Sequence, residues 1–318
     1  MPRNTKQRKT MQNSVNNRSG RQAYIITGPT SGIGLATALE IAKHGTVVLV
    51  GRDVEKLGKV QKTIQEKGGH AVPVVCNLSD IVSVRRAAAK IIDLRLPLAG
   101  LVNNAGIHEM VPTKSAQGWD LDFATNHVGP FVLAETLMPH LPDGANVVFV
   151  ASGVEDPERI PAVKVGFRGG RYISAEASAR GEWLSGGAKM PGADAYATSK
   201  QCTLATAMEF ARETPRLHIN AVEPGFTPKT ALARDANALV RFTLHYILHF
   251  LAPHIKYWST PQQAARVITK VLLNEAGATG VYYDDKGDSM LSSQQVRDPR
   301  FTARMVSETR ALLATVRA

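Results

Sequence analysis

Short apolar runs alternate with longer amphipathic stretches along most of the chain. The apolar runs are rich in β-branched residues and bounded by turn-forming ones, as expected for strands. They predict strands at 23–27, 46–50, 71–75, 98–102, 146–150 and 217–222. The helical spacing of apolar residues between them predicts helices at 35–45, 54–67, 81–94 and 118–140, and one that contains residues 195–200. Strands that alternate with helices indicate an α/β fold with a doubly wound parallel sheet, whose ligands bind beyond the carboxyl ends of the strands.

A glycine-rich turn joins the first predicted strand to the first predicted helix. Its glycines are spaced Gly28-x3-Gly32-x-Gly34. Glycines let a phosphate approach the backbone, and the N-terminus of the following helix presents N–H groups to it. The turn is therefore predicted to hold a pyrophosphate, and an ordinary strand-to-helix turn is the alternative.

Tyr196 and Lys200 are four residues apart, which on a helix places phenol and ammonium on one face. A free tyrosine titrates near pH ~10, and a nearby cation favours the phenolate. The pair therefore suits proton exchange during interconversion of a carbonyl and an alcohol. By itself this spacing also arises by chance in many helices.

The motifs follow one another in a specific order. They are Thr27-Gly-x3-Gly-x-Gly34, Asn103-Asn-Ala-Gly106, Asn126, Ser152, Tyr196-x3-Lys200 and Pro224-Gly225. In this order they resemble the short-chain dehydrogenase/reductase family, of the retinol-dehydrogenase-like or carbonyl-reductase-like type, over about residues 22–230. The resemblance implies a single Rossmann domain that transfers a hydride between a nicotinamide and a carbonyl carbon.

The resemblance also implies a role for each of four catalytic residues. Tyr196 would be the general acid/base, and Lys200 would lower its pKa and hold the nicotinamide ribose. Ser152 would polarise the carbonyl. Asn126 would keep a water in line with Lys200.

For the cofactor, the resemblance implies NADP(H) in preference to NAD(H). Arg52 follows the second strand, where an acid would grip the ribose hydroxyls and repel a 2′-phosphate. The alternative is a solvated Arg52, with Asp53 binding the ribose. The expected cofactor residues are Gly28, Ser31, Gly32, Ile33, Gly34, Arg52, Asn77, Leu78, Asn104, Ala105, Gly106, Tyr196, Lys200, Pro224, Gly225 and Thr227. Asn77 stands where the family usually has Asp, and Lys229 stands where a cofactor-binding threonine is common.

Composition narrows the function classes. The chain is 44% hydrophobic, has two cysteines and nine histidines, and carries a net charge of +11. We expect no disulfide scaffold, no metal and no membrane-spanning segment, and a reducing, cytoplasmic location. Residues 1–22 read as a disordered basic tail, whose six Lys and Arg account for more than half of the charge. No basic stripe interleaved with aromatics follows, so nucleic-acid binding is not favoured.

Residues 23–318 are predicted to form one domain with two additions. A Gly/Arg/Ala-rich insertion at 153–194 precedes the Tyr196 helix, with Trp183 and Leu184 as expected anchors. Residues 231–260 are expected to cover the substrate, since the part at 239–251 is apolar around most of a helix. A buried helix or peripheral membrane docking is the alternative there. A lipophilic ketone, aldehyde or sterol-like substrate is therefore favoured over a small sugar.

Two rival functions remain open at this point. One is reduction of a C=C bond, as in the light-dependent protochlorophyllide reductases of the same superfamily. The other is a non-catalytic NADP(H)-binding regulator, which the complete catalytic set argues against. Many relatives pair through the Tyr-Lys helix, and an insertion that packs on this helix favours a monomer over a homodimer.

Overall fold

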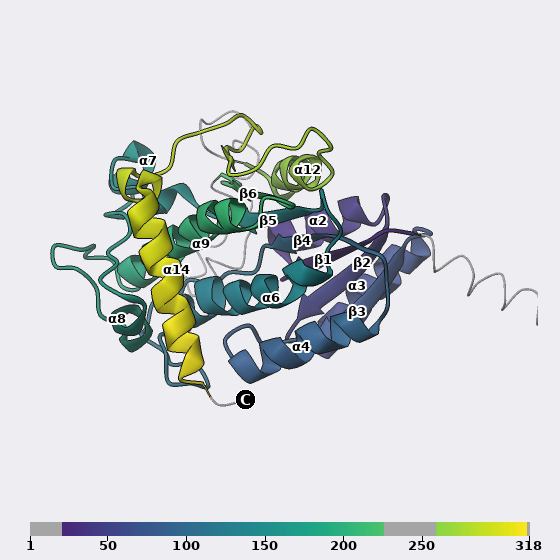
Figure 1. Ribbon diagram of the computed structural model, residues 1–318, viewed down its shortest axis with the longest axis horizontal. Coiled ribbons are helices and arrows are strands. Elements are labelled where there is room, and N and C mark those ends of the chain that lie inside the picture. The colour runs from purple at the N-terminus through teal and green to yellow at the C-terminus, as the bar shows by residue number, and fades with distance from the viewer. Residues whose placement is uncertain (1–20, 226–258, 317–318) are drawn as a thin grey trace, which may run out of the picture.

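The computed structural model describes residues 21–225 and 259–316, and its centre is one seven-stranded sheet (Figure 1). The strands lie in the order β3-β2-β1-β4-β5-β6-β7 and all neighbours are parallel. Their bounds are β1 Ala23–Thr27, β2 Thr46–Gly51, β3 His70–Val75, β4 Leu98–Asn103, β5 Asn146–Val150, β6 His218–Val222 and β7 Tyr282–Tyr283. The single α/β domain with a doubly wound parallel sheet is thus confirmed.

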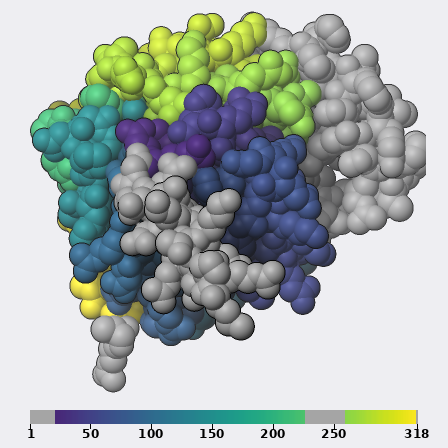
Figure 2. Space-filling model, turned by 90° about the vertical axis from the view of Figure 1, so that its right-hand side faces the viewer, coloured from purple at the N-terminus to yellow at the C-terminus, as the bar shows by residue number. Residues whose placement is uncertain are grey.

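Helices cover both faces of the sheet. Their bounds are α2 Gly32–Ile41, α3 Val54–Glu66, α4 Ile81–Asp93, α5 Leu121–Phe123, α6 Gly129–Leu137, α7 Ile160–Lys164, α8 Ala175–Arg180, α9 Ala193–Glu213, α12 Pro261–Leu272, α13 Gln294–Arg297 and α14 Pro299–Ala314. Alternate residues of β1 enter different cores, because side chains on a strand alternate between faces. Ile25 belongs to the core beneath α4, α6, α9 and α14, and Ile26 to the one beneath α2, α3 and α12. In Figure 2 the purple residues of α2 and the light-green residues of α12 form one continuous surface.

The predicted strands lie within one residue of those observed, but the predicted helix 118–140 is interrupted. It begins at Leu121, opens into a π-helical turn η1 at Ala124–Val128, and ends in a 3₁₀ turn η2 at Met138–His140. Asn126 lies in the π turn, and its main-chain oxygen accepts the Thr203 hydroxyl at 2.9 Å. A π turn inside a helix leaves a carbonyl free for such a contact. The predicted covering segment at 231–260 falls outside the described residues, apart from its last two.

The insertion at 153–194 docks on α9 and α14. It holds a 3₁₀ turn η3 at Gly153–Glu155 together with α7 and α8. Its buried anchor is Tyr172, whose hydroxyl donates to Glu308 Oε2 of α14 at 2.6 Å. The expected anchor Leu184 is instead exposed, while Trp183 is partly buried against the core. Tyr172 reaches the partly buried Glu308 because α14, which the sequence patterns did not predict, lies across α9 (Figure 1).

Candidate active site

A pocket opens at the carboxyl ends of the strands, beside the point between β1 and β4 where the strand order reverses. Such a switch point is the usual ligand site of an open parallel sheet. Turns that follow six of the strands contribute to its lining. Those expected from sequence are Gly28, Ser31, Gly32, Ile33, Gly34, Arg52, Asn77, Leu78, Asn104, Ala105, Gly106, Tyr196, Lys200 and Pro224. Gly225 has a positive φ of 72° directly after this pocket's rim, and Thr227 lies outside the described residues.

The glycine turn is packed too closely for side chains. Gly28 has a φ of +67°, and a Cβ on Gly34 would stand 2.1 Å from the Gly28 oxygen. Thr27 links this turn to the one after β4, since its hydroxyl accepts hydrogen bonds from the N–H groups of Asn104 and Ala105 at 3.0 Å each. Helix α2 begins here with no acidic residue in its first turn. An N-terminus without a competing carboxylate suits the pyrophosphate of a dinucleotide.

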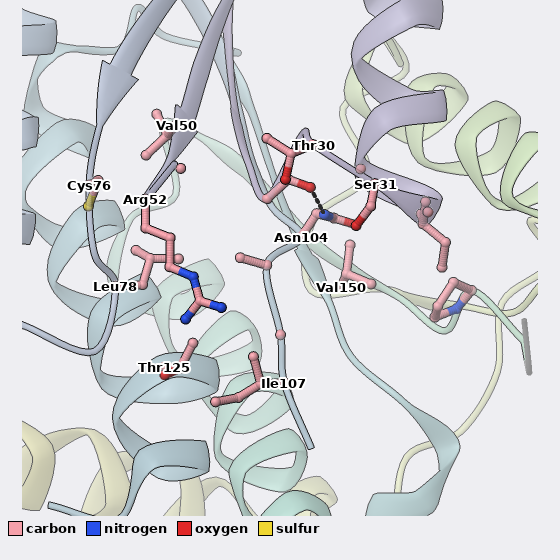
Figure 3. A pocket seen from close by; sticks show the side chains of 18 of the residues that line it. Thr30, Ser31, Val50, Arg52, Cys76, Leu78, Asn104, Ile107, Thr125 and Val150 are labelled. Atoms are coloured by element: carbon pink, nitrogen blue, oxygen red, sulfur yellow. Dashed lines mark hydrogen bonds between the residues drawn. The ribbon is translucent and has the colours of Figure 1, made fainter. Parts of the chain in front are cut away.

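Arg52 and Asp53 differ in what they do at the end of β2. The exposed Arg52 side chain extends into the pocket from one side, while Ser31 and Asn104 lie on the other (Figure 3). The carboxylate of Asp53 accepts the Lys56 N–H at 3.0 Å as the N-cap of α3, and it pairs with the Lys56 ammonium. A carboxylate used as a cap is not directed at a ribose. The geometry therefore favours Arg52 over Asp53 as the group that meets the nucleotide.

Several lining residues were not anticipated from the sequence. By contrast, Asn77 was expected to contact the cofactor; its side-chain oxygen accepts a hydrogen bond from the Ser79 hydroxyl of the same turn at 2.9 Å. The unanticipated residues are Thr30, Val50, Gly51, Cys76, Ile107, Thr125, Val150 and Ala151. Most of them adjoin an expected residue, so the rule that ligands bind beyond the strand ends would have found them.

The four expected catalytic residues come from three separate segments of the chain. Tyr196 and Lys200 lie on α9, Ser152 follows β5, and Asn126 lies in the π turn. The Ser152 hydroxyl lies close enough to the phenol of Tyr196 to lower the pKa of that phenol. The Lys200 ammonium donates to the Val150 oxygen at 2.9 Å and lies 5.9 Å from the centroid of the Tyr196 ring. The fold thus brings the expected groups together.

Burial dominates the protonation of the Tyr-Lys pair. It raises the pKa of Tyr196 above its ordinary value, and the nearby Asp122 carboxyl raises it further, whereas the Ser152 hydroxyl lowers it. Burial lowers the pKa of Lys200 to about 8. The net shift of the Tyr196 pKa is thus upward, and the expected effect of Lys200 on it stays a prediction. Both groups are desolvated, which disfavours phenolate and ammonium alike.

Three side chains near Tyr196 were missed by the sequence reasoning. The His108 ring stacks on the Tyr196 ring with centroids 4.9 Å apart, and the Phe167 ring lies 6.2 Å from the same centroid. The Asp122 carboxyl is buried, and burial together with Asp120 raises its pKa to about 8. No pattern in the sequence distinguished these residues, because they meet Tyr196 only in the tertiary structure.

Ser152 is supported by a buried ion pair. The Glu223 carboxylate accepts the N–H of Gly153 and pairs with Arg159 of the insertion at 2.7 Å. A Cβ at Gly153 would stand 2.5 Å from a Glu223 oxygen. A side chain at the residue that follows Ser152 would therefore displace the Glu223 carboxylate, and this ion pair ties the insertion to the loop that carries the serine.

The described residues contain no group of three or more His, Cys, Asp or Glu arranged to hold a metal ion. Over the same residues, no helix combines the length and apolar character needed to cross a membrane.

Known proteins resemble this chain in sequence and in fold. A family model for short chain dehydrogenases matches residues 22–161. The chloroplastic protochlorophyllide reductase A of Hordeum vulgare is 28% identical over 297 residues, with 86% of this chain and 76% of that protein covered. A putative daunorubicin C-13 ketoreductase of Streptomyces sp. (strain C5) is 29% identical over 277 residues, with 85% of each covered.

The fold of this chain also matches solved structures. The crystal structure of angucycline C-6 ketoreductase LanV with bound NADP superposes with a TM-score of 0.61 at 24% identity. The match covers 85% of this chain and 96% of that one. It extends beyond the residues that the family model matches.

Proposed function

Because this chain belongs to the short-chain dehydrogenase/reductase family, we propose that it interconverts a carbonyl and an alcohol on a lipophilic substrate with NADP(H). The observation that carries this proposal is the convergence of Tyr196, Lys200 and Ser152 at the end of the nucleotide pocket. The ketoreductase relative and the NADP bound to the LanV structure support it. The pocket at the carboxyl ends of the strands would hold the cofactor, and Tyr196 at its end would meet the substrate.

The glycine turn and the N-terminus of α2 would bind the pyrophosphate of the cofactor, and Arg52 would meet the 2′-phosphate. NADPH supplies a hydride when bound. Tyr196 would donate a proton to the substrate oxygen, and the Ser152 hydroxyl would donate a hydrogen bond to the same oxygen as charge develops on it. Lys200 would hold the nicotinamide ribose. Burial of the Tyr196 side chain favours the protonated phenol, which is the form that a reduction requires.

The test is NADPH consumption with a broad panel of ketones and aldehydes, with the products identified by mass and by NMR. We expect alcohols as products, formed by the wild type and not by Tyr196→Phe. A panel that leaves NADPH unconsumed, while NADPH still binds, would favour the non-catalytic regulator.

Reduction of a C=C bond is the second candidate function. The observation that favours it is the similarity to protochlorophyllide reductase A over 86% of this chain. A product that has gained two hydrogens across a C=C bond and kept its carbonyl would establish it in place of carbonyl reduction. Enone substrates are therefore the most informative members of the panel, because each reaction leaves a different product from them.

We further propose that the protein is a monomer. Helix α14 packs along α9, the helix through which many relatives pair. Arg310 of α14 reaches both Glu135 of α6 and Glu213 of α9, at 2.7 and 2.6 Å. A second copy would have to displace these contacts. Light scattering should give the mass of one chain, and a dimer mass that persists on dilution would contradict this.

A further inference from the structure

The segment from Ile107 to Glu109 is held at both of its ends. The Asn126 side-chain oxygen accepts the Ile107 N–H at 2.8 Å, and its amide nitrogen donates to the Ile107 oxygen at 2.8 Å. The two Asp122 oxygens accept the Glu109 N–H at 3.1 and 3.3 Å. Asp122 and Asn126 are four residues apart in the helical stretch α5 to η1, so both face this segment. They grip the backbone on either side of His108.

His108 is the residue between these two grips, and its ring meets the candidate proton donor. The His108 and Tyr196 rings stack at 4.9 Å with an interplanar angle of 28°. Phe167 of the insertion lies 6.1 Å from the His108 ring and 6.2 Å from the Tyr196 ring. Aromatic rings at these separations attract one another beyond simple area burial, by about 0.5–1.5 kcal/mol. The position of His108 therefore bears directly on the orientation of the phenol.

We propose that Asp122 is a positioning residue of this active site, which fixes the backbone at Glu109 and thereby holds the His108 ring against Tyr196. The Asn126 side chain fixes the segment at Ile107, on the other side of His108. The Asp122 grip closes the end at Glu109, so that His108 has one position relative to the phenol. The proposal rests on the proposed function only for its kinetic measurement.

The buried Asp122 carboxyl has a hydrogen-bond partner and several charged neighbours. A buried polar group without a hydrogen-bond partner is costly, and the Glu109 N–H supplies that partner. Asp120 and Glu109 disfavour a charge on Asp122, and Lys200 favours it. On its outer side Asp122 lines a second cavity of the described structure, whose charged residues also include Lys114, Arg180, Lys189 and Asp194. A charge on Asp122 in turn acts on both Tyr196 and Lys200.

The structural test is independent of turnover and uses NMR of the full chain with labelled histidines. The His108 ring signal is identified by its loss in His108→Leu, and stacking on Tyr196 displaces this signal from the range of exposed histidines. Asp122→Ala, which removes the acceptor, should return the signal towards that range. Asp122→Asn, which keeps an acceptor oxygen, should leave it in place.

Asp120→Asn is the matched control. Asp120 is also buried and lies two residues earlier, but its carboxyl caps α5 by accepting the Phe123 N–H at 2.9 Å. It is expected to leave the His108 signal unchanged. An unchanged His108 signal in folded Asp122→Ala, or an equal displacement in all three variants, would overturn the proposal. If Asp122→Ala does not fold, Asp122→Leu takes its place, because it also removes the acceptor but fills the volume of the side chain; return of the His108 signal towards the range of exposed histidines then supports the proposal, and an unchanged signal overturns it.

The kinetic arm separates positioning from general stability. Asp122→Ala is expected to lower kcat by about 10- to 100-fold through misplacement of the phenol, with the KM for NADPH within about threefold of wild type. His108→Leu should cause a similar loss, and the double variant should add little to either, since one acts through the other. Additive losses would contradict the proposal. A wild type that turns over no carbonyl would instead count against the proposed function, and the NMR result would still decide the role of Asp122.

Discussion

The two ends of the candidate active site are built in different ways. The end proposed to bind the nucleotide (the nucleotide end) consists largely of the turn after β1 and of backbone groups, and its principal charge, Arg52, is exposed. The end proposed to transfer the proton (the proton-transfer end) gathers Asn126, Ser152 and Tyr196 from separate segments, and there the ionisable groups are buried. At the first end, a side chain acts largely as it would in water. At the second end, its behaviour depends on neighbours that are distant in sequence.

This difference shows in the protonation of the groups. Asp53, at the nucleotide end, has a lowered pKa because the Lys56 N–H donates to it as a helix cap. Asp122, at the other end, has a pKa raised to about 8 by burial and by Asp120. The pKa values of these two carboxyls thus shift in opposite directions, because hydrogen bonds from Lys56 outweigh desolvation at Asp53, whereas desolvation is the largest cause at Asp122.

The largest effect is expected at the proton-transfer end. Tyr196→Phe should lower the reduction rate by about 10²- to 10⁴-fold, which is the usual contribution of a positioned general acid. NADPH affinity, measured by fluorescence titration, should change by less than about threefold. Lys200→Ala is the comparison variant and should impair both turnover and NADPH affinity. If Tyr196→Phe keeps most of its turnover, the proton donor is another group.

At the nucleotide end, Arg52→Ala should weaken NADPH binding. Loss of a charge-assisted hydrogen bond to the 2′-phosphate costs about 1.5–3 kcal/mol, or roughly 10- to 150-fold in affinity. NADH affinity should stay the same, because NADH lacks that phosphate. Lys56→Ala is the matched control, since Lys56 is a nearby exposed cation that pairs with Asp53 and does not line the pocket. Equal losses for NADPH and NADH would show that Arg52 does not read the phosphate.

The buried carboxyl predicts a pH-dependent stability difference. A folded-state pKa of about 8 for Asp122 lies above the unfolded value of ~3.9, so the folded chain binds the extra proton between these values. Its contribution to stability therefore falls as pH rises from about 4 to about 8. Asp122→Asn removes this dependence. The difference in Tm between Asp122→Asn and wild type should grow from pH 5 to pH 8, and a constant difference would show that Asp122 is ionised in the folded state.

The smallest effect is expected for the ion pairs between α14 and the helices α6 and α9. Arg310→Ala removes a partly exposed ion-pair network between α14, α6 and α9. Surface pairs contribute little, so we expect a loss of about 0.5–1 kcal/mol in the free energy of unfolding by urea. Lys43→Ala is the control, because it breaks an exposed pair within one stretch of chain, and should change less. A loss well above this range would mean that the Arg310 contacts with the Phe131 and Phe210 rings dominate.

The strands and the glycine turn were predictable because their patterns are local. A run of β-branched residues predicts a buried strand without reference to the rest of the chain. The glycines at positions 28 and 34 predict a turn in which the backbone leaves no room for a side chain. The two-residue strand β7 and the short helices of the insertion lie below the length at which a pattern can be recognised. Helix α14 carries a clear apolar face, but only its packing on α9 reveals what that face covers.

The amino-acid sequence by itself determined six of the seven strands of the described structure, most of the helices that connect them, the glycine turn, and the Tyr196 and Lys200 pair on one helix face. These depend on residues that are adjacent or one helical turn apart. Only the tertiary structure decided that Asp53 is a helix cap, that Tyr172 anchors the insertion, and that Asp122 and His108 meet the catalytic helix. The physical reason is that burial and charge at a site are sums over neighbours in space, and those neighbours are far apart in the chain.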